Sequence, residues 1–152
     1  MDIFEQSLAA LNVDIHFNHE GCFTCTLKGE DGGSGLNLFV YKHVQQVSLS
    51  LIMMGQTDIP EKGSHALLMQ LGERAMSPLN EGLGVGILPN TQRISVYKKV
   101  TLLDKPLGYV MDNINQLIAE LELWDRYLLG DETVFQSSQP NSHARPRLQV
   151  LV

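Results

Sequence analysis

The sequence predicts one α+β domain in which helices and strands follow the order α-β-β-β-α-β-β-α and the strands form an antiparallel sheet. The middle of the chain alternates apolar and polar residues in several short segments, which is typical of strands with one buried face. Short turn-rich links join neighbouring segments, which favours antiparallel pairing. Near both ends, apolar residues instead recur every three or four positions, which is the spacing of a helix.

The first two helices are predicted from their caps. Asp2 and Glu5 form a capping-box pair, and the apolar residues after them share one helical side, which predicts a short helix over about residues 3–11. Ser64 is a second good N-cap residue. Leucine and alanine residues follow it at helical spacing, so a second helix is expected over about residues 65–76.

The last helix has the clearest pattern in the chain. Between Leu107 and Trp124 its apolar residues recur at spacings of 3, 1, 3, 3, 1, 3 and 3. This stripe predicts a helix of about 22 residues that reaches Leu128 and stops near Gly130. Trp124 lies near the stripe and is therefore expected in the core rather than against a ligand.

Five strands are expected between these helices. Three of them, Cys22–Leu27, Leu36–Val40 and Val47–Met53, follow one another across short links and predict an antiparallel meander. The other two are Gly82–Leu88 and Arg93–Leu102. The glycines of the fourth segment lack the frame of a nucleotide-binding loop, and they favour a strand that permits a close backbone approach.

The two faces of the meander differ in composition. One face is almost purely apolar and is expected to pack under the last helix; its residues are Leu38, Val40, Leu49, Leu51 and Met53. The other face mixes Ser and Thr with large apolar side chains, and such a face is covered by the first helix, a dimer mate or a partner. The residues expected to bind a partner are Phe4 and Leu8 of the first helix together with Phe39, Tyr41, Ile52 and Met54 of this second face.

The domain is expected to span residues 1–130, followed by a disordered tail over residues 131–152. From Asp131 onward the composition shifts to Ser, Gln, Pro, Asn and Arg, which bury too little apolar surface to order a chain. The tail ends on the apolar residues Leu148–Val152. A domain of this size buries about 68–70% of its unfolded surface, so it needs neither a metal nor a disulfide to fold.

Composition and charge exclude several partner classes. Hydrophobic residues make up 43% of the chain and charged residues 18%, which is ordinary globular composition. Eleven Lys and Arg against seventeen Asp and Glu give a net charge of −6, so neither nucleic acid nor anionic membrane is expected as a partner. The most apolar stretch, Leu49–Met54, is far shorter than the roughly 20 residues of a membrane span, and the first residues do not resemble a signal peptide. We therefore expect an intracellular protein without membrane insertion.

Four potential metal ligands follow one another at a spacing of three: His16, His19, Cys22 and Cys25. These are all residue types that bind zinc, but too little chain separates the two pairs to wrap one ion. A strand through the cysteines would place their side chains on opposite faces, because an offset of three is odd. A turn near residues 18–21 that leads into a strand is therefore the favoured interpretation, without a metal. The same strand argues against a redox pair, which needs a helix N-terminus.

No residue receives a catalytic assignment. Ser64 and His65 are adjacent, but no acidic residue accompanies them and no nucleophile elbow is present. We therefore expect neither an enzyme nor a cofactor site.

From about residue 3 to residue 128 the chain resembles the class I chaperones of bacterial type III secretion, the Tir-chaperone family. The order of elements, the acidic charge, the small size and the long last helix with its late tryptophan all contribute to the resemblance. The segments that carry it are Ile15–Cys22 before the first strand, Ser48–Gly55 and Asp58–Pro60 in the third strand and its exit, His65–Met69 in the second helix, and Asn80–Gly82 before the fourth strand.

This resemblance implies a bacterial cytoplasmic homodimer without enzymatic activity. Members of the family bind the N-terminal chaperone-binding segment of one or several type III effectors and keep it ready for secretion, which is a role in virulence. The family pattern places the second helix and the strands that follow it at the two-fold interface, with Leu68, Leu71 and Ala75 as the interface residues.

Two other functions stay open at this point. Some relatives of this architecture sequester a transcriptional control protein instead of an effector. A small zinc or thiol-redox protein built on His16, His19, Cys22 and Cys25 is the alternative from a different class.

Overall fold

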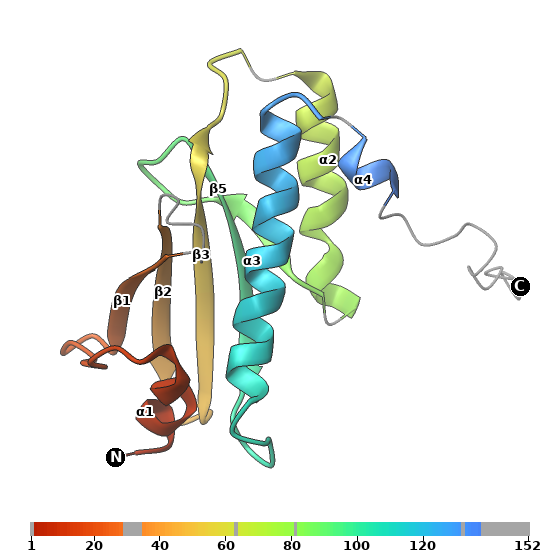
Figure 1. The fold of residues 1–152 in the computed structure, drawn as a ribbon. Helices are drawn as coiled ribbons and strands as arrows, with labels where there is room; N and C mark the ends of the chain where they lie inside the picture. Colours follow the sequence, from red (N-terminus) through yellow and green to blue (C-terminus); the bar gives the residue numbers. More distant parts are fainter. Residues whose placement is uncertain (1, 29–34, 63, 81, 132, 138–152) are drawn as a thin grey trace, which may run out of the picture.

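The computed structural model describes residues 2–28, 35–62, 64–80, 82–131 and 133–137 (Figure 1). The helices are α1 (Ile3–Leu8), α2 (His65–Ala75), α3 (Tyr109–Leu128) and α4 (Val134–Ser137), with 3-10 turns at Ala9–Leu11 and Ser77–Asn80. The strands are β1 (Cys22–Leu27), β2 (Leu36–His43), β3 (Ser48–Asp58), β4 (Gly84–Ile87) and β5 (Arg93–Thr101). The predicted α+β class and the predicted order of eight elements are confirmed, and α4 is an addition to them.

The five strands form one antiparallel sheet in the order β1-β2-β3-β5-β4. The predicted meander is present, because β1 pairs with β2 and β2 pairs with β3. After β3 the chain passes through α2 to the far edge, where it forms β4, and then returns as β5 between β4 and β3. The last strand in the sequence therefore lies inside the sheet.

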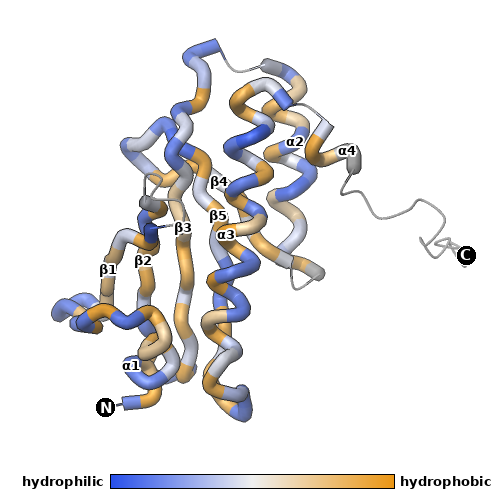
Figure 2. The backbone as a smooth tube through the Cα atoms, in the orientation of Figure 1, coloured by the Kyte–Doolittle hydropathy of each residue, from blue (hydrophilic) through white to orange (hydrophobic). Residues whose placement is uncertain are grey.

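The core lies between one face of the sheet, here called the core face, and the helices. The strand residues that point into the core include Phe23, Leu38, Val40, Leu49, Leu51, Met53, Ile94, Val96 and Val100, all buried. Helix α3 packs across β3 and β5 on this face, and hydrophobic and hydrophilic stretches alternate along it in Figure 2. The predicted apolar face is thus the covered one, and Trp124 is fully buried, as expected.

Helix α1 begins as the sequence predicts but presents its apolar side inward. The Asp2 carboxylate accepts a hydrogen bond from the Glu5 backbone N–H at 2.8 Å, and the Glu5 carboxylate accepts one from the Asp2 N–H at 3.3 Å. Phe4 and Leu8 then point into the core, where 6% and 0% of their surfaces remain exposed. This corrects the expectation that the two side chains face a partner. Helix α1 lies beside α3, and its apolar side chains are buried in the core of this chain.

The domain continues past its predicted boundary at residue 130. Residues Val134 and Phe135 of α4 are buried, and the Phe135 ring lies 4.5 Å from the Trp124 ring and 5.3 Å from the Tyr127 ring between centroids. The Arg74 guanidinium of α2 lies over the same ring at 3.9 Å. The first part of the predicted tail is therefore a packed helix. Residues 138–152, including Leu148–Val152, lie outside the described residues.

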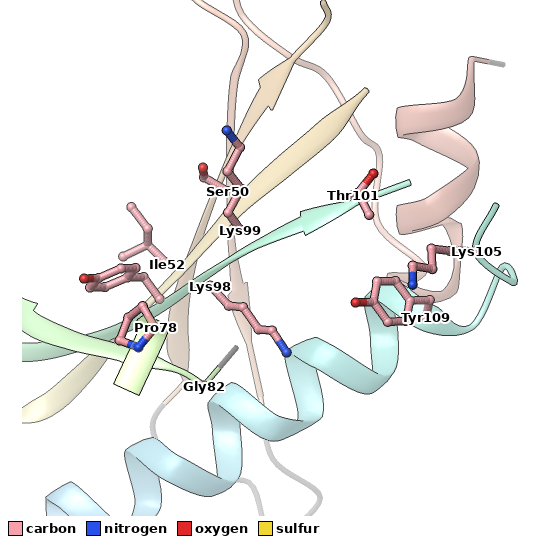
Figure 3. Close-up of a pocket in the computed structure, with 10 residues that line it drawn as sticks. Ser50, Ile52, Pro78, Gly82, Lys98, Lys99, Thr101, Lys105 and Tyr109 are labelled. Carbon is pink, nitrogen blue, oxygen red and sulfur yellow. The ribbon is translucent and has the colours of Figure 1, made fainter. Parts of the chain in front are cut away.

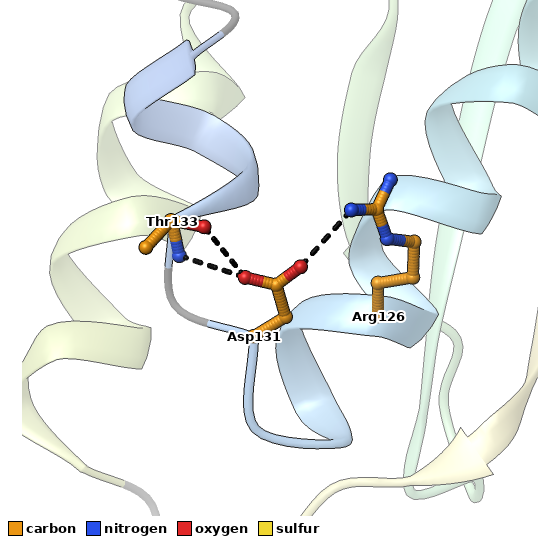
Figure 4. Close-up of polar contacts among 3 residues, drawn as sticks. All are labelled: Arg126, Asp131 and Thr133. Carbon is orange, nitrogen blue, oxygen red and sulfur yellow. Dashed lines mark hydrogen bonds and ion pairs between the residues drawn. The ribbon is translucent and has the colours of Figure 1, made fainter.

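Hydrogen bonds hold the turn that leads into α4 (Figure 4). The Asp131 carboxylate accepts bonds from the Thr133 hydroxyl at 2.6 Å and from the Arg126 guanidinium at 3.0 Å. These bonds hold the pKa of Asp131 below its usual value. The turn reverses the chain directly after α3, so that α4 folds back onto the end of that helix.

Candidate protein-binding surface

All helices that contact the sheet lie on its core face, which leaves the opposite face without a helix in the described part of the chain (Figure 1). We call this opposite face the open face. The strand registers place on it Cys22, Thr24 and Thr26 of β1, Asn37, Phe39 and Tyr41 of β2, Ser50, Ile52 and Met54 of β3, and Ser95, Tyr97 and Lys99 of β5. A sheet face that carries several large apolar residues without cover favours contact with another molecule.

One row of residues crosses the centre of the open face on all five strands. Thr24 pairs with Phe39, Phe39 with Ile52, Ile52 with Tyr97, and Tyr97 with Gly84. Directly opposed residues in antiparallel strands have adjacent side chains, so Phe39, Ile52 and Tyr97 form a continuous apolar band. Phe39 and Ile52 are half-buried, and 42% of the Tyr97 surface is exposed.

The end of this row depends on the missing side chain of Gly84. A Cβ atom there would lie 2.1 Å from the Cζ atom of the Tyr97 ring. The ring therefore lies directly over the backbone of β4, a position that a side chain would occupy. The close approach expected at this glycine-rich strand is therefore present at Gly84, and the group that approaches its backbone is the Tyr97 ring.

A second row lies beside the first and is more polar. Cys22 pairs with Tyr41, Tyr41 with Ser50, and Ser50 with Lys99. A hydrogen bond with Cys22 raises the pKa of Tyr41 above its usual value, so this phenol is neutral at physiological pH. The His43 Nε2 atom lies 2.7 Å from the Ser50 hydroxyl. The open face thus combines an apolar band with hydrogen-bonding groups at its side.

Four of the six residues expected to bind a partner come together on the open face: Phe39, Tyr41, Ile52 and Met54. That these residues bind a partner stays a prediction. Sequence reasoning missed Tyr97, although the alternation of Ile94, Val96 and Val100 already places Tyr97 on the other side of its strand. The missing information was that β5 lies next to β3, which no local pattern encodes.

The residues expected at a dimer interface lie on α2, whose outer side is strongly apolar. Leu68 retains 63% of its exposed surface, Ala75 is exposed, and Leu71 is half-buried against the core. Met69, Met76 and Leu79 extend the exposed apolar surface along α2 and the following turn. These three residues were not expected from the sequence. Their role at an interface, like that of Leu68, Leu71 and Ala75, stays a prediction.

The four potential metal ligands do not converge. Cys22 lies on the open face and Cys25 on the core face, as the odd spacing predicts. Asn18 forms the expected turn, since its side-chain oxygen accepts hydrogen bonds from the backbone N–H groups of Glu20 and Cys22, each at 2.9 Å. Burial raises the pKa of the Cys25 thiol, which disfavours the thiolate that redox chemistry needs. No group of three or more metal-binding side chains gathers among the described residues.

Comparison with solved structures identifies the fold. A chain of the HopA1-SchA chaperone-effector complex has a TM-score of 0.59 to this chain at 16% sequence identity, over 80% of this chain and 89% of that chain. A chain of the ExsC-ExsE complex has a TM-score of 0.62 at 14% identity, over 83% of this chain and 90% of that chain. No protein-family model and no curated protein sequence matches the chain. The fold is class I chaperone-like, as the resemblance in the sequence implies. No helix in the described ranges is long and apolar enough to cross a membrane.

Proposed function

We infer that the protein is a cytoplasmic, non-enzymatic chaperone of bacterial type III secretion, which binds the N-terminal segment of an effector protein on its open face. The observation that carries this proposal is the uncovered band of Phe39, Ile52 and Tyr97. The fold shared with a chain of a chaperone-effector complex supports it.

The chemistry of the open face fits a segment that is not folded on its own. The band offers an apolar platform across the strands, and the row with Tyr41, Ser50 and Lys99 offers hydrogen bonds beside it. An amphipathic client segment can place its apolar side on the first row and its polar side over the second. Burial of roughly 800 Å² on each partner would make an interface of standard size.

We also propose that the protein is a homodimer and that α2 lies at the interface between the two copies. Exposed apolar side chains on Leu68, Met69 and Met76 support this, because water contact with such a surface is unfavourable in a monomer.

Display of N-terminal protein segments from the genome that encodes this chain tests the client proposal. The wild-type protein should enrich segments of secreted effectors. Phe39→Ala removes a central anchor, which typically costs about 2 kcal/mol or more, so the affinity for the enriched segments should fall by at least about 30-fold. Ile52→Asp should reduce it further, because it places a charge in the apolar band.

Leu107→Ala is the matched control, since Leu107 is an exposed leucine in the turn before α3, away from the open face. Circular dichroism must show that all three variants keep the wild-type fold. Equal affinity of the wild type and of a folded Ile52→Asp variant for the enriched segments would show that the open face is not the client site.

A further inference from the structure

Half of strand β5 has a free edge. On one side β5 pairs with β3, from Thr101 opposite Ser48 to Ser95 opposite Met54 and, beyond a register shift, at Arg93 opposite Asp58. On its other side it pairs with β4 only from Ile94 to Tyr97. Within the described residues, no strand lies beside Lys98–Thr101 on that side. Unpaired backbone N–H and C=O groups of this kind are a template for an additional strand.

A cavity of about 640 Å³ lies along this free edge (Figure 3). Its lining residues are Ser50, Ile52, Pro78, Gly82, Tyr97, Lys98, Lys99, Thr101, Lys105 and Tyr109. Ile52, Pro78 and the two tyrosines give it apolar walls. The lining residues come from β3, from β5, from the segment before β4 and from the region where α3 begins, so the cavity lies beside Lys98–Thr101.

The cavity is positively charged although the protein is acidic. Three of the six lysines in the chain line it, and none of its described lining residues is acidic, whereas the whole chain has a net charge of −6. No ion pair between described residues includes Lys98, Lys99 or Lys105. The Lys105 ammonium lies 5.0 Å from the centre of the Tyr109 ring, which holds it at the cavity rim. A negatively charged occupant is therefore complementary to this site.

Two adjacent lysines point to opposite sides of the sheet. Lys98 points toward α3, and Lys99 points to the open face beside Ser50 (Figure 3). In an added strand, consecutive side chains also alternate between the two sides. Two consecutive acidic residues would therefore meet one lysine each, whereas two acidic residues separated by one position would both lie on the same side.

We propose that this free edge binds an extended protein segment with two consecutive acidic residues, which joins the sheet as a strand beside Lys98–Thr101. A protein segment fits better than a polyphosphate or a nucleic acid, because a strand edge presents N–H donors and C=O acceptors and a nucleic-acid backbone offers it few donors. The net charge of −6 also opposes a long polyanion. This site adjoins the open face, with which its cavity shares Ser50, Ile52, Tyr97 and Lys99, but the added strand and its acidic pair go beyond the proposed function.

Peptide titration of the full chain, followed by amide NMR shifts, tests this inference. The probe is a peptide of alternating Thr and Val with a central Asp-Glu pair. We expect shifts at the amides of Lys98–Thr101 and a loss of affinity as salt is raised. Two control peptides carry Asn-Gln at the centre, or Asp and Glu separated by one residue; both should bind at least about 5-fold more weakly.

Charge reversal of the two lysines gives the matched protein variants. The pair Lys98→Glu and Lys99→Glu should weaken binding of the acidic peptide by at least about 5-fold. The pair Lys28→Glu and Lys62→Glu, at exposed lysines outside the cavity, changes the net charge equally and should leave binding unchanged. If the first pair does not fold, Lys98→Gln with Lys99→Gln takes its place.

Several outcomes would overturn the inference. These are equal weakening by both variant pairs, equal binding of the peptide with separated acids, and tighter binding of a single-stranded oligonucleotide at the same amides. A wild-type dimer that separates when Lys98 and Lys99 are reversed would instead assign this edge to a second copy of the chain. Lys98 points away from the open face, so the single variant Lys98→Glu separates the two proposals. It should weaken binding of the acidic peptide and keep the wild-type affinity for effector segments, whereas Phe39→Ala should do the reverse.

Discussion

A single missing side chain shapes the candidate binding band. Tyr97 can lie across β4 only because residue 84 has no Cβ atom. The part of Tyr97 that approaches Gly84 is the end of the ring that carries the hydroxyl group. Because the Tyr97 side chain is partly exposed, it can turn away from a Cβ atom at residue 84. Gly84 therefore controls where an aromatic ring sits on the open face more than it controls the stability of the sheet.

Gly84→Ala should move the Tyr97 ring while the fold persists. We expect the ring NMR signals of Tyr97 to shift and affinity for client segments to fall, with a loss of less than about 1 kcal/mol in the free energy of unfolding. Gly86→Ala is the control, because a Cβ there has no atom within 4 Å. Unchanged Tyr97 signals in the Gly84→Ala protein would contradict this assignment. In a Tyr97→Ala background the Gly84→Ala change should have no further effect on binding.

At the level of elements, α4 acts as a clip that joins α2 to α3. Its Phe135 ring packs on Trp124 and Tyr127 of α3 and under Arg74 of α2, while Arg74 also pairs with Glu120 of α3 at 3.0 Å. Helix α2 has only one buried residue of its own, Leu67. The contact of Phe135 with Arg74 therefore adds to the contacts that α2 makes with β4 and α3.

Removal of the clip should destabilise the protein, whereas removal of the residues after it should not. Deletion of residues 138–152 is expected to leave the melting temperature nearly unchanged. Deletion of residues 131–152 should lower it clearly, because Val134 and Phe135 leave the core. Phe135→Ala alone should cost up to about 3–5 kcal/mol, the range for large-to-small core substitutions. Chemical unfolding of the three proteins checks this; equal stability of the two truncations would show that α4 does not contribute.

Much of the arrangement of elements was predictable because it is encoded locally. Caps, helical stripes and alternation are properties of neighbouring residues, so Asp2, Ser64 and the stripe ending at Trp124 located the helices within a few positions. The clip α4 was not predictable, because Val134 and Phe135 are only two apolar residues in a polar stretch. Their burial depends on a groove that exists only after α2 and α3 have packed.

The candidate site was predictable only in part for the same reason. Alternation placed Phe39, Tyr41, Ile52 and Met54 on one face, because a period of two is read from the strand itself. Tyr97 required knowledge of a pairing between distant strands. The inward direction of Phe4 and Leu8 required knowledge of where α1 docks.

For the whole molecule, the exposed leucine and methionine residues of α2 predict a dimer. Light scattering should give about twice the chain mass of 16.9 kDa at micromolar concentration. Leu68→Asp should produce a folded monomer, because a dimer would bury its charge without a partner, at a cost of several kcal/mol. Leu107→Asp, at another exposed leucine, should stay dimeric. A strictly monomeric wild-type protein would contradict the proposed interface.

The position of β5 inside the sheet has a consequence for the order in which the chain folds. The pairs within the meander join residues close in sequence, such as Cys25 with Leu38, and need only short loop closures. Pairing of Met53 with Val96 must instead close a loop of more than forty residues that contains α2 and β4. On a ribosome, the first three strands emerge well before the strand and helix that complete them. Their apolar core face therefore stays open until the last third of the chain has been synthesised, and this non-local step is the one expected to limit the folding rate.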